Sequence, residues 1–406
     1  MKKILFIIFL SIYLNLENFA QNFVTIKGRE FIDKNGKPFQ VKSVGLGFWL
    51  MPEGYWWEMN GGLAPRQYFD LIADMIGPEE SRKFWKKFQD SFIQESDLKY
   101  IKSLGLNTVR IPFDYRLFTD EYYLGSYEPR GFELFDKIIG WCKNIDLNVI
   151  LDMHAAPGSQ AGWHSDDGYV YPWLFEDNGE VYQKQTIDIW KSIAKRYANE
   201  TIVIGYELLN EPLHQYYDTA RLNPRLEIFY KKLTKEIREV NKNHIIFITG
   251  SHWNRNFDVL GKPYDSKLAY AVHLYNFTDD YTSFDYFVNF SKKYQVPLWL
   301  SEFGEYETSI VDSLRTLCDL NQVSWSLWSY KKMNNNHCLI QIKKPDFWDE
   351  VTKYSFQCYK KWIEKLENRP SNEKSAKAFQ QLLENMLFQN CIKSEFYLKA
   401  LNLKCP

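Results

Sequence analysis

Short apolar runs alternate along the chain with longer amphipathic stretches, and this alternation predicts most of the fold. Eight runs are apolar or β-branched throughout, as expected for strands that are buried on both faces. They span Val41–Phe48, Asn107–Pro112, Val149–Met153, Ile202–Leu208, Ile245–Thr249, Leu268–Leu274, Pro297–Leu300 and Val323–Trp328. The stretches between them, such as Gly131–Asn144 and Val181–Ala198, have one apolar face and predict helices.

Eight strands alternating with helices predict an α/β protein, namely a closed (β/α)₈ TIM barrel. An open, doubly wound sheet is the competing fold. It is disfavoured because no glycine-rich phosphate loop follows the first strand.

Three segments add to the regular alternation. Phe23–Ile26 and Glu30–Phe39 read as an N-terminal β-hairpin, with Asn35-Gly36 as the turn signal, and we expect it to plug one end of the barrel. Residues 49–94 and 155–179 form enlarged loops after strands 1 and 3. Because both loops follow strands, they lie on the face where barrel enzymes build their active sites.

The N-terminus predicts a signal peptide over residues 1–20. Lys2 and Lys3 precede an apolar run, Ile4–Leu14, and cleavage is expected near Ala20–Gln21. The run is about half the roughly 20 residues that a membrane helix needs; an uncleaved anchor is the alternative. We therefore expect a secreted, periplasmic or extracellular monomer with no membrane contact in its mature form. Residues 21–390 would form one domain and residues 391–406 a C-terminal extension. The tail after residue 335, with the helix-like stretch Ala378–Leu387, is expected to supply an eighth barrel helix.

The composition is balanced in charge and rich in aromatic residues. With 50 basic and 51 acidic residues the net charge is −1, which gives no long-range field for nucleic acid or anionic lipid. Aromatic residues make up 17% of the chain, a surplus that suits a cleft stacking the flat faces of sugar rings. Candidate platforms are Trp56, Trp57, Trp163 and Trp173, with a buried structural role as the alternative for each.

The six cysteines are widely spaced and do not form metal-ligand motifs. They predict buried thiols with at most one disulfide, for which Cys391 and Cys405 are the best pair.

Two predicted strands end in glutamates. Strand 4 runs into Asn210-Glu211-Pro212 and strand 7 into Ser301-Glu302-Phe303-Gly304. Strand ends of one barrel meet in space, and cleavage of a glycosidic bond needs two carboxyl groups flanking it. Arg110 in strand 2 can pair with a carboxylate and keep Glu302 ionised. The amide of Asn210 can hydrogen-bond a sugar 2-hydroxyl.

These motifs resemble the acid/base and nucleophile motifs of glycoside hydrolase family 5, the cellulase family A. The resemblance continues in family order over roughly residues 24–335. It includes Gly105–Pro112 around Arg110, Leu151–His154, Val272–Tyr275 and the strand 8 tryptophan, Trp328.

The resemblance implies a role for each matching residue. Glu211 would be the general acid/base and Glu302 the nucleophile, supported by Arg110 and Tyr275. His154 and His273 would hydrogen-bond sugar hydroxyls, and Trp328 would form the floor of the −1 sugar subsite. No cofactor is implied. No metal is expected either, because the histidines and acids lack ligand spacing.

The predicted reaction is retaining hydrolysis of a β-linked oligo- or polysaccharide, with a carboxyl separation of about 5–5.5 Å. His154–Gln160 and Gly45–Leu50 are similar to the exo-β-1,3-glucanase branch, although Phe48 stands where that branch usually has glycine and Trp163–Phe175 matches poorly. β-Glucosides or β-glucans are therefore favoured, with endo-β-1,4-glucanase and β-mannanase as alternatives. A non-catalytic glycan-binding barrel and a metal-dependent amidohydrolase are the rival classes.

Overall fold

The computed structural model describes residues 23–119, 130–166, 168–275 and 281–405. Eight parallel strands close into a barrel, and β11 pairs with β4 to complete the ring. Each strand lies on one of the eight predicted runs, so the predicted (β/α)₈ barrel is confirmed. The strands are β4 (Lys42–Gly45), β5 (Thr108–Asp114), β6 (Asn148–Ala155), β7 (Val203–Glu207), β8 (Ile245–Thr249), β9 (Leu268–His273), β10 (Leu298–Phe303) and β11 (Ser324–Leu327).

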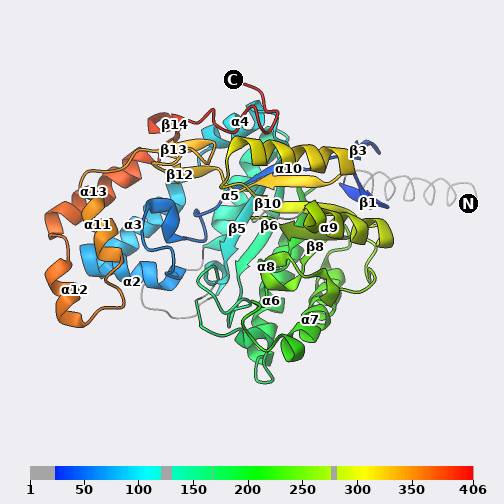
Figure 1. Cartoon of the computed structure of the whole chain (residues 1–406), viewed down its shortest axis with the longest axis horizontal. Coiled ribbons are helices and arrows are strands. Elements are labelled where there is room, and N and C mark those ends of the chain that lie inside the picture. The colour runs from blue at the N-terminus through cyan, green and yellow to red at the C-terminus, as the bar shows by residue number, and fades with distance from the viewer. Residues whose placement is uncertain (1–22, 120–129, 167, 276–280, 406) are drawn as a thin grey trace, which may run out of the picture.

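Helices follow the strands and surround the barrel (Figure 1). Each turns an apolar face inward, as α6 does with Ile189, Trp190 and Ile193, because this burial removes the apolar stripe from water. The surrounding helices are α4 (Glu95–Ser103), α5 (Gly131–Asn144), α6 (Glu180–Arg196), α7 (Thr219–Val240), α9 (Tyr281–Tyr294) and α10 (Thr308–Asn321).

The chain after β11 leaves the barrel pattern. It forms β12 (Lys331–Met333), β13 (Ile340–Ile342), α11 (Trp348–Ser355), α12 (Trp362–Asn368), α13 (Asn372–Asn385) and β14 (Ile392–Lys393). The expected helix near residue 380 therefore exists as α13. It does not take the eighth barrel position, because Phe379 packs against Phe84, with ring centroids 5.1 Å apart, on an inserted helix. That partner belongs to the pair α2 (Pro65–Ile76) and α3 (Pro78–Ser91), beside which α13 lies (Figure 1).

The C-terminal segment lies between α10 and α4. Arg315 of α10 donates to the carbonyl of Ala400 at 2.8 Å, and the amide of Lys404 donates to the carbonyl of Leu104 at 2.9 Å. Tyr397 is fully buried. The segment predicted as an extension thus packs against the barrel.

The N-terminal hairpin closes the bottom of the barrel, as predicted. β1 (Thr25–Lys27), β2 (Glu30–Ile32) and β3 (Pro38–Phe39) form an antiparallel sheet. Phe31 of β2 packs against Phe247 of β8, with ring centroids 5.9 Å apart. The Asn35-Gly36 turn separates β2 from β3, so the second predicted strand is in fact two.

Two of the four proposed sugar platforms belong to the core. Trp56 and Trp57 are each 1% exposed, because the loop after β4 folds back into a cluster of aromatic rings. Trp348 fixes this loop by donating its indole hydrogen to the carbonyl of Trp57 at 2.6 Å. Phe48 has a positive φ of 72°, a conformation that favours the glycine usual at its position, and packs on Trp57.

All six cysteines are free, so the suggested pair of Cys391 and Cys405 is wrong. Cys391 instead donates its thiol to the carbonyl of Asn385, whereas Cys405 is exposed.

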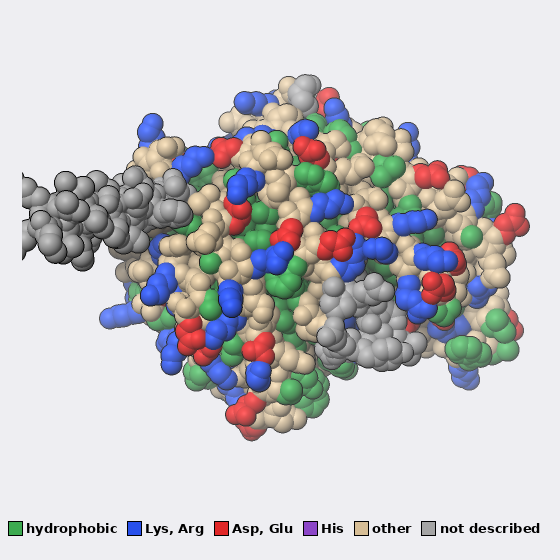
Figure 2. Space-filling view, turned by 180° about the vertical axis from the view of Figure 1, so that it is seen from behind, with side chains coloured by type: hydrophobic (Ala, Val, Ile, Leu, Met, Phe, Trp, Pro, Cys, Tyr) green, Lys and Arg blue, Asp and Glu red, His purple; other side chains and the backbone are tan. Residues whose placement is uncertain are grey.

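Cationic and anionic side chains are interspersed over the face seen in Figure 2, in keeping with the balanced net charge. Among the helices in the described ranges, none has both the length and the apolar character to cross a bilayer.

Candidate active site

A pocket of about 300 Å³ opens at the carboxyl ends of the barrel strands. Six of the eight predicted site residues line it: His154, Glu211, His273, Tyr275, Glu302 and Trp328. The other two, Arg110 and Asn210, contact lining residues from below. The barrel therefore brings together residues that are far apart in the sequence.

Arg110 of β5 is fully buried and binds four acceptors. Its Nε donates to Glu207 Oε2 at 2.6 Å, and its Nη2 lies 2.9 Å from Asp152 Oδ2. Nη2 also donates to Asn210 Oδ1 at 3.0 Å, and Nη1 donates to Glu302 Oε1. Asp152 lies within β6, whereas Glu207 ends β7 and Glu302 lies near the end of β10, so one guanidinium links three strands.

Glu302, at the end of β10, receives a donor on each carboxylate oxygen. Arg110 binds Oε1, and Tyr275 donates its hydroxyl to Oε2 at 2.8 Å. Hydrogen bonds from such donors stabilise the charged form of a carboxylate and restrict its rotamer. The expected contact between Tyr275 and Glu302 is thus present.

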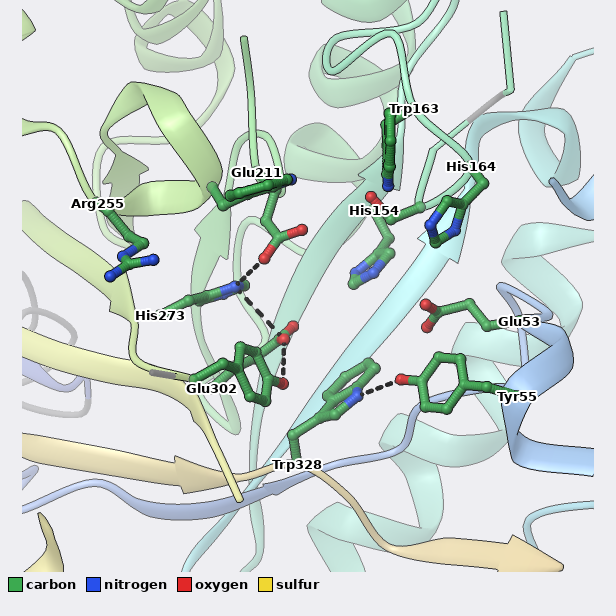
Figure 3. Close-up of a pocket in the computed structure, with 13 residues that line it drawn as sticks. Glu53, Tyr55, His154, Trp163, His164, Glu211, Arg255, His273, Glu302 and Trp328 are labelled. Atoms are coloured by element: carbon green, nitrogen blue, oxygen red, sulfur yellow. Dashed lines mark hydrogen bonds and ion pairs between the residues drawn. The ribbon is translucent and has the colours of Figure 1, made fainter. Parts of the chain in front are cut away.

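Glu211, just beyond β7, lies in a different environment. Burial raises the pKa of its carboxyl above the ordinary value. His273 Nδ1 lies 2.8 Å from Glu211 Oε1 and 3.4 Å from Glu302 Oε2. Burial lowers the pKa of His273 to about 4, so the ring is neutral at neutral pH. An oxygen of Glu211 and one of Glu302 lie within 4.8 Å of each other across the pocket (Figure 3).

His154 is bonded on both ring nitrogens. Its Nδ1 donates to Asp152 Oδ2 at 2.8 Å, and its Nε2 accepts from Asn210 Nδ2 at 3.2 Å. The carboxylate can only accept, so it sets the tautomer. Arg110 binds Asn210 Oδ1, which fixes the amide orientation. One amide hydrogen of Asn210 remains for a ligand. The sequence assigned His154 to sugar hydroxyls, but these contacts favour a role in orienting Asn210.

Trp328 follows β11 and forms one wall of the pocket. Its indole nitrogen donates to the Tyr55 hydroxyl at 2.9 Å, and its ring lies parallel to that of His154 with centroids 5.6 Å apart. Gly45 and Gly47 make room for this ring, because a Cβ on either would lie 2.6 Å or 2.8 Å from it. Close packing of the Trp328 ring thus explains why the Gly45–Leu50 motif has glycine at these two positions.

The two enlarged loops contribute residues that the motifs did not reveal. Glu53 and Tyr55 come from the loop after β4, and the Glu53 carboxyl points into the pocket (Figure 3). Burial, and then the charges of Glu302 and Glu211, raise the pKa of Glu53 well above its ordinary value. Such loop residues have no periodicity to predict them.

The second loop and the loop after β8 also reach the pocket. Trp163 lines it as proposed, whereas Trp173 is exposed elsewhere. Trp253 and Arg255, which no sequence pattern predicted, line it as well.

Glu211, His273 and Glu302 could each offer one ligand atom to a metal ion, within 4.8 Å of one another. The permanent charge of Arg110 on Glu302 disfavours a divalent cation there, because like charges repel across a short, buried distance. The geometry suits a pair of carboxyl groups acting without a metal.

Comparison with known proteins identifies the family. The model of "Cellulase (glycosyl hydrolase family 5)" matches residues 73–336. A beta-xylosidase of Phanerodontia chrysosporium is 30% identical over 347 residues, which cover 76% of this chain and 71% of that protein. The chain belongs to glycoside hydrolase family 5. It is therefore a glycoside hydrolase, and the resemblance seen in its motifs is confirmed.

Other family relatives match shorter parts. Endoglucanase C of Acetivibrio thermocellus is 34% identical over 48% of this chain and 53% of its own length. A glucan 1,3-beta-glucosidase of Candida oleophila is 30% identical over 58% of this chain and 57% of its own. The chain spans little more than half of these two proteins. The rutinosidase of Aspergillus niger shares the fold, with a TM-score of 0.59 at 17% identity, over 73% of this chain and 91% of that one.

Proposed function

We propose that this family 5 enzyme is a secreted, retaining β-glycosidase that acts on β-glucosides or β-glucans. One observation carries the proposal: oxygens of Glu211 and Glu302 lie within 4.8 Å of each other in the pocket, in contrasting environments. Retaining enzymes hold their carboxyl groups about 5–5.5 Å apart, whereas inverting enzymes need about 6.5–9.5 Å to admit a water. The short separation supports retention.

The two environments support different roles. Glu302, whose two oxygens accept hydrogen bonds from Arg110 and Tyr275, is oriented to attack the anomeric carbon. Glu211, whose pKa burial raises, gives its proton to the departing oxygen as the glycosidic bond breaks. A covalent glycosyl-enzyme forms on Glu302. Glu211 then takes a proton from a water that attacks the same carbon, and the sugar leaves with its configuration retained.

The neighbouring groups serve the same two steps. Asn210 donates its remaining amide hydrogen to the sugar 2-hydroxyl, a bond that strengthens in the transition state. His273 Nδ1 lies 2.8 Å from Glu211 Oε1 and can donate to that carboxyl once it has lost its proton, because a carboxylate only accepts. Trp328 supports the face of the reacting sugar.

The shape of the pocket favours release of a terminal sugar. Glu53 and Tyr55 form a wall on the side away from Arg255, whereas an endo-acting enzyme needs a groove open at both ends (Figure 3). A volume of about 300 Å³ is at the lower end for small-molecule sites. A β-xyloside is the second candidate, supported by the 30% identity to a beta-xylosidase over 76% of this chain.

The remaining proposals concern processing and assembly. The signal peptide, residues 1–20, lies outside the described residues, and secretion rests on its charged and apolar segments. We further propose a monomer whose catalytic domain comprises residues 21–390. N-terminal sequencing of the exported protein should begin at Gln21.

Trapping the covalent intermediate tests the mechanism. A 2-deoxy-2-fluoro-β-glucoside or β-xyloside with a dinitrophenyl leaving group should inactivate the enzyme and leave its sugar on the peptide containing Glu302. Glu302→Gln should abolish labelling and turnover, whereas Glu307→Gln, an exposed change in the loop after β10, should preserve both. A label on another residue, or a product of inverted configuration by NMR, would reject the proposal.

A further inference from the structure

Arg255 is a cation of the pocket that the proposed mechanism does not use. It lines the pocket and is half-buried. Its guanidinium forms neither a hydrogen bond nor an ion pair with any residue of the described ranges. Lys332, also close to the pocket, is instead paired with Glu305. A guanidinium offers five donors and no acceptor, so a free one facing a pocket is suited to an anionic ligand.

The backbone before Arg255 adopts a conformation that is rare for side chains other than glycine. His252, Trp253 and Asn254 have φ values of 56°, 58° and 61° in succession. The amide of His252 donates to the carbonyl of Leu213 at 2.8 Å, which ties this loop to the one carrying Glu211. Such strain persists where surrounding contacts enforce it, and it is concentrated at functional sites.

Arg255 lies on the side of the pocket where a leaving group would sit. Figure 3 shows it beyond Glu211 and His273, away from the wall formed by Glu53 and Tyr55. In the proposed mechanism Glu211 protonates the departing oxygen, so the aglycone extends past Glu211. Arg255 therefore faces the aglycone and not the sugar that is transferred to the enzyme.

Trp253 lies two residues before Arg255, and a second tryptophan of the pocket, Trp163, lies across Glu211 from Arg255 (Figure 3). Trp163 and Trp253 line the pocket and both pack on His214, with ring centroids at 4.8 Å and 3.9 Å. The imidazole between them restricts both indoles. The indole of Trp253 and the guanidinium of Arg255, which has no partner within the described ranges, describe a site for a flat or cyclic group that bears an anion.

We propose that the preferred aglycone carries a carboxylate, which Arg255 binds while Trp253 contacts the ring that bears it. The inference rests on the proposed function, because it concerns the leaving group of that reaction. The planar guanidinium matches a carboxylate with two parallel hydrogen bonds. The carboxylate can belong to an acidic sugar or to an aromatic acid, and the substrates tested distinguish these sources.

Matched substrates isolate the contribution of the carboxylate. The 4-carboxyphenyl β-glycoside and its 4-carboxamide are compared in the parent enzyme, Arg255→Gln and Arg255→Lys. Arg255→Gln should lower the ratio of kcat/KM for acid over amide by about ten- to a hundredfold, mainly through KM. For Arg255→Lys this ratio should lie between the values for the parent enzyme and Arg255→Gln. Intrinsic differences between the leaving groups cancel, because the same two substrates are used with each protein.

A second pair of substrates identifies the source. These are disaccharide substrates that release either glucuronic acid or glucose. If Arg255→Gln lowers the ratio of kcat/KM for the acidic over the neutral disaccharide, the aglycone is an acidic sugar. If it lowers only the ratio for the aryl pair, the aglycone is an aromatic acid. Arg82→Gln, which removes a surface charge paired with Glu79, should leave both ratios unchanged.

The outcomes separate this inference from the proposed function. If the ratios of kcat/KM for acidic over neutral substrates do not change in Arg255→Gln, the inference is overturned. Continued turnover of the amide in that case still supports the proposed hydrolase. An equal loss on acid and amide also overturns it, since Arg255 would then act through Glu211. If the parent enzyme fails to cleave the amide and neutral disaccharides, the proposed function itself fails.

Discussion

The contacts of His154 predict that this histidine acts through Asn210, and a double-mutant cycle can test that claim. In His154→Phe the ring can keep its parallel packing on Trp328, but the acceptor for Asn210 Nδ2 is lost. The amide then keeps only its bond from Arg110. The measured quantity is the ratio of kcat/KM for a β-glucoside over its 2-deoxy analogue, which reports the contact to the 2-hydroxyl.

The expected magnitudes follow from the bonds involved. Asn210→Ala removes a fixed donor to the reacting sugar, and loss of such a donor lowers rates by about 10²–10³-fold. His154→Phe removes one neutral hydrogen bond that orients this donor, so the ratio should fall by about two- to tenfold. In the double variant the second change should have no further effect, because no amide remains to be oriented.

The assay separates orientation from direct contact. Initial rates for both substrates are measured for the four proteins, and their urea midpoints show that each is folded. Losses that multiply in the double variant would show that His154 binds the sugar independently, as its sequence motif suggested, and would refute the reasoning from its two bonded nitrogens.

Three further changes test other parts of the structure. Glu211→Ala should slow cleavage of a phenyl glycoside by about 10²–10⁴-fold and should slow cleavage of a dinitrophenyl glycoside far less. Azide should restore turnover of this variant and give a β-glycosyl azide. Formation of an α-azide would contradict retention. Arg255→Gln should move the falling limb of the pH profile for a neutral substrate to higher pH, because Arg255 lowers the pKa of Glu211 and only the protonated acid is active; a shift to lower pH would contradict this. Lys331→Met should lower the free energy of unfolding by about 3–5 kcal/mol, since it leaves Asp97 buried without its cation at 2.7 Å; a loss below about 1 kcal/mol in urea titrations would show that burial offsets the pair.

The barrel and the centre of the site could be predicted because they depend on the same segments. Strands buried on both faces give continuous apolar runs, and polar residues at their ends stand out against that background. Glu211 follows β7 in this way, Glu302 lies near the end of β10, and Arg110 lies within β5. Since strand ends of one barrel converge, their proximity follows from the topology.

The periphery of the site could not be predicted, because its positions depend on loop conformation. Glu53 lies in a loop without periodicity, and the turn before Arg255 uses positive φ at Trp253, where no glycine signals it. The prediction of an eighth barrel helix was wrong for a related reason. The helix α13 does have an apolar face, but that face packs on the inserted helix α3. An amphipathic pattern predicts that one face of a helix is buried, but not which element buries it.

The buried charges below the pocket bear on whether the barrel is catalytic. Arg110 lies among the carboxylates of Asp152, Glu207 and Glu302, almost fully removed from water. Replacing such a cluster by well-packed apolar residues is often neutral or stabilising by about 1–4 kcal/mol, so stability alone gives little reason to keep it. Removing one member is costly, because it leaves a charge unpaired. A barrel that only bound glycans would need neither the two donors on Glu302 nor the His273 contact that spans both glutamates. The cluster is best explained by a reaction in which charge on Glu302 is used and then restored at every turnover.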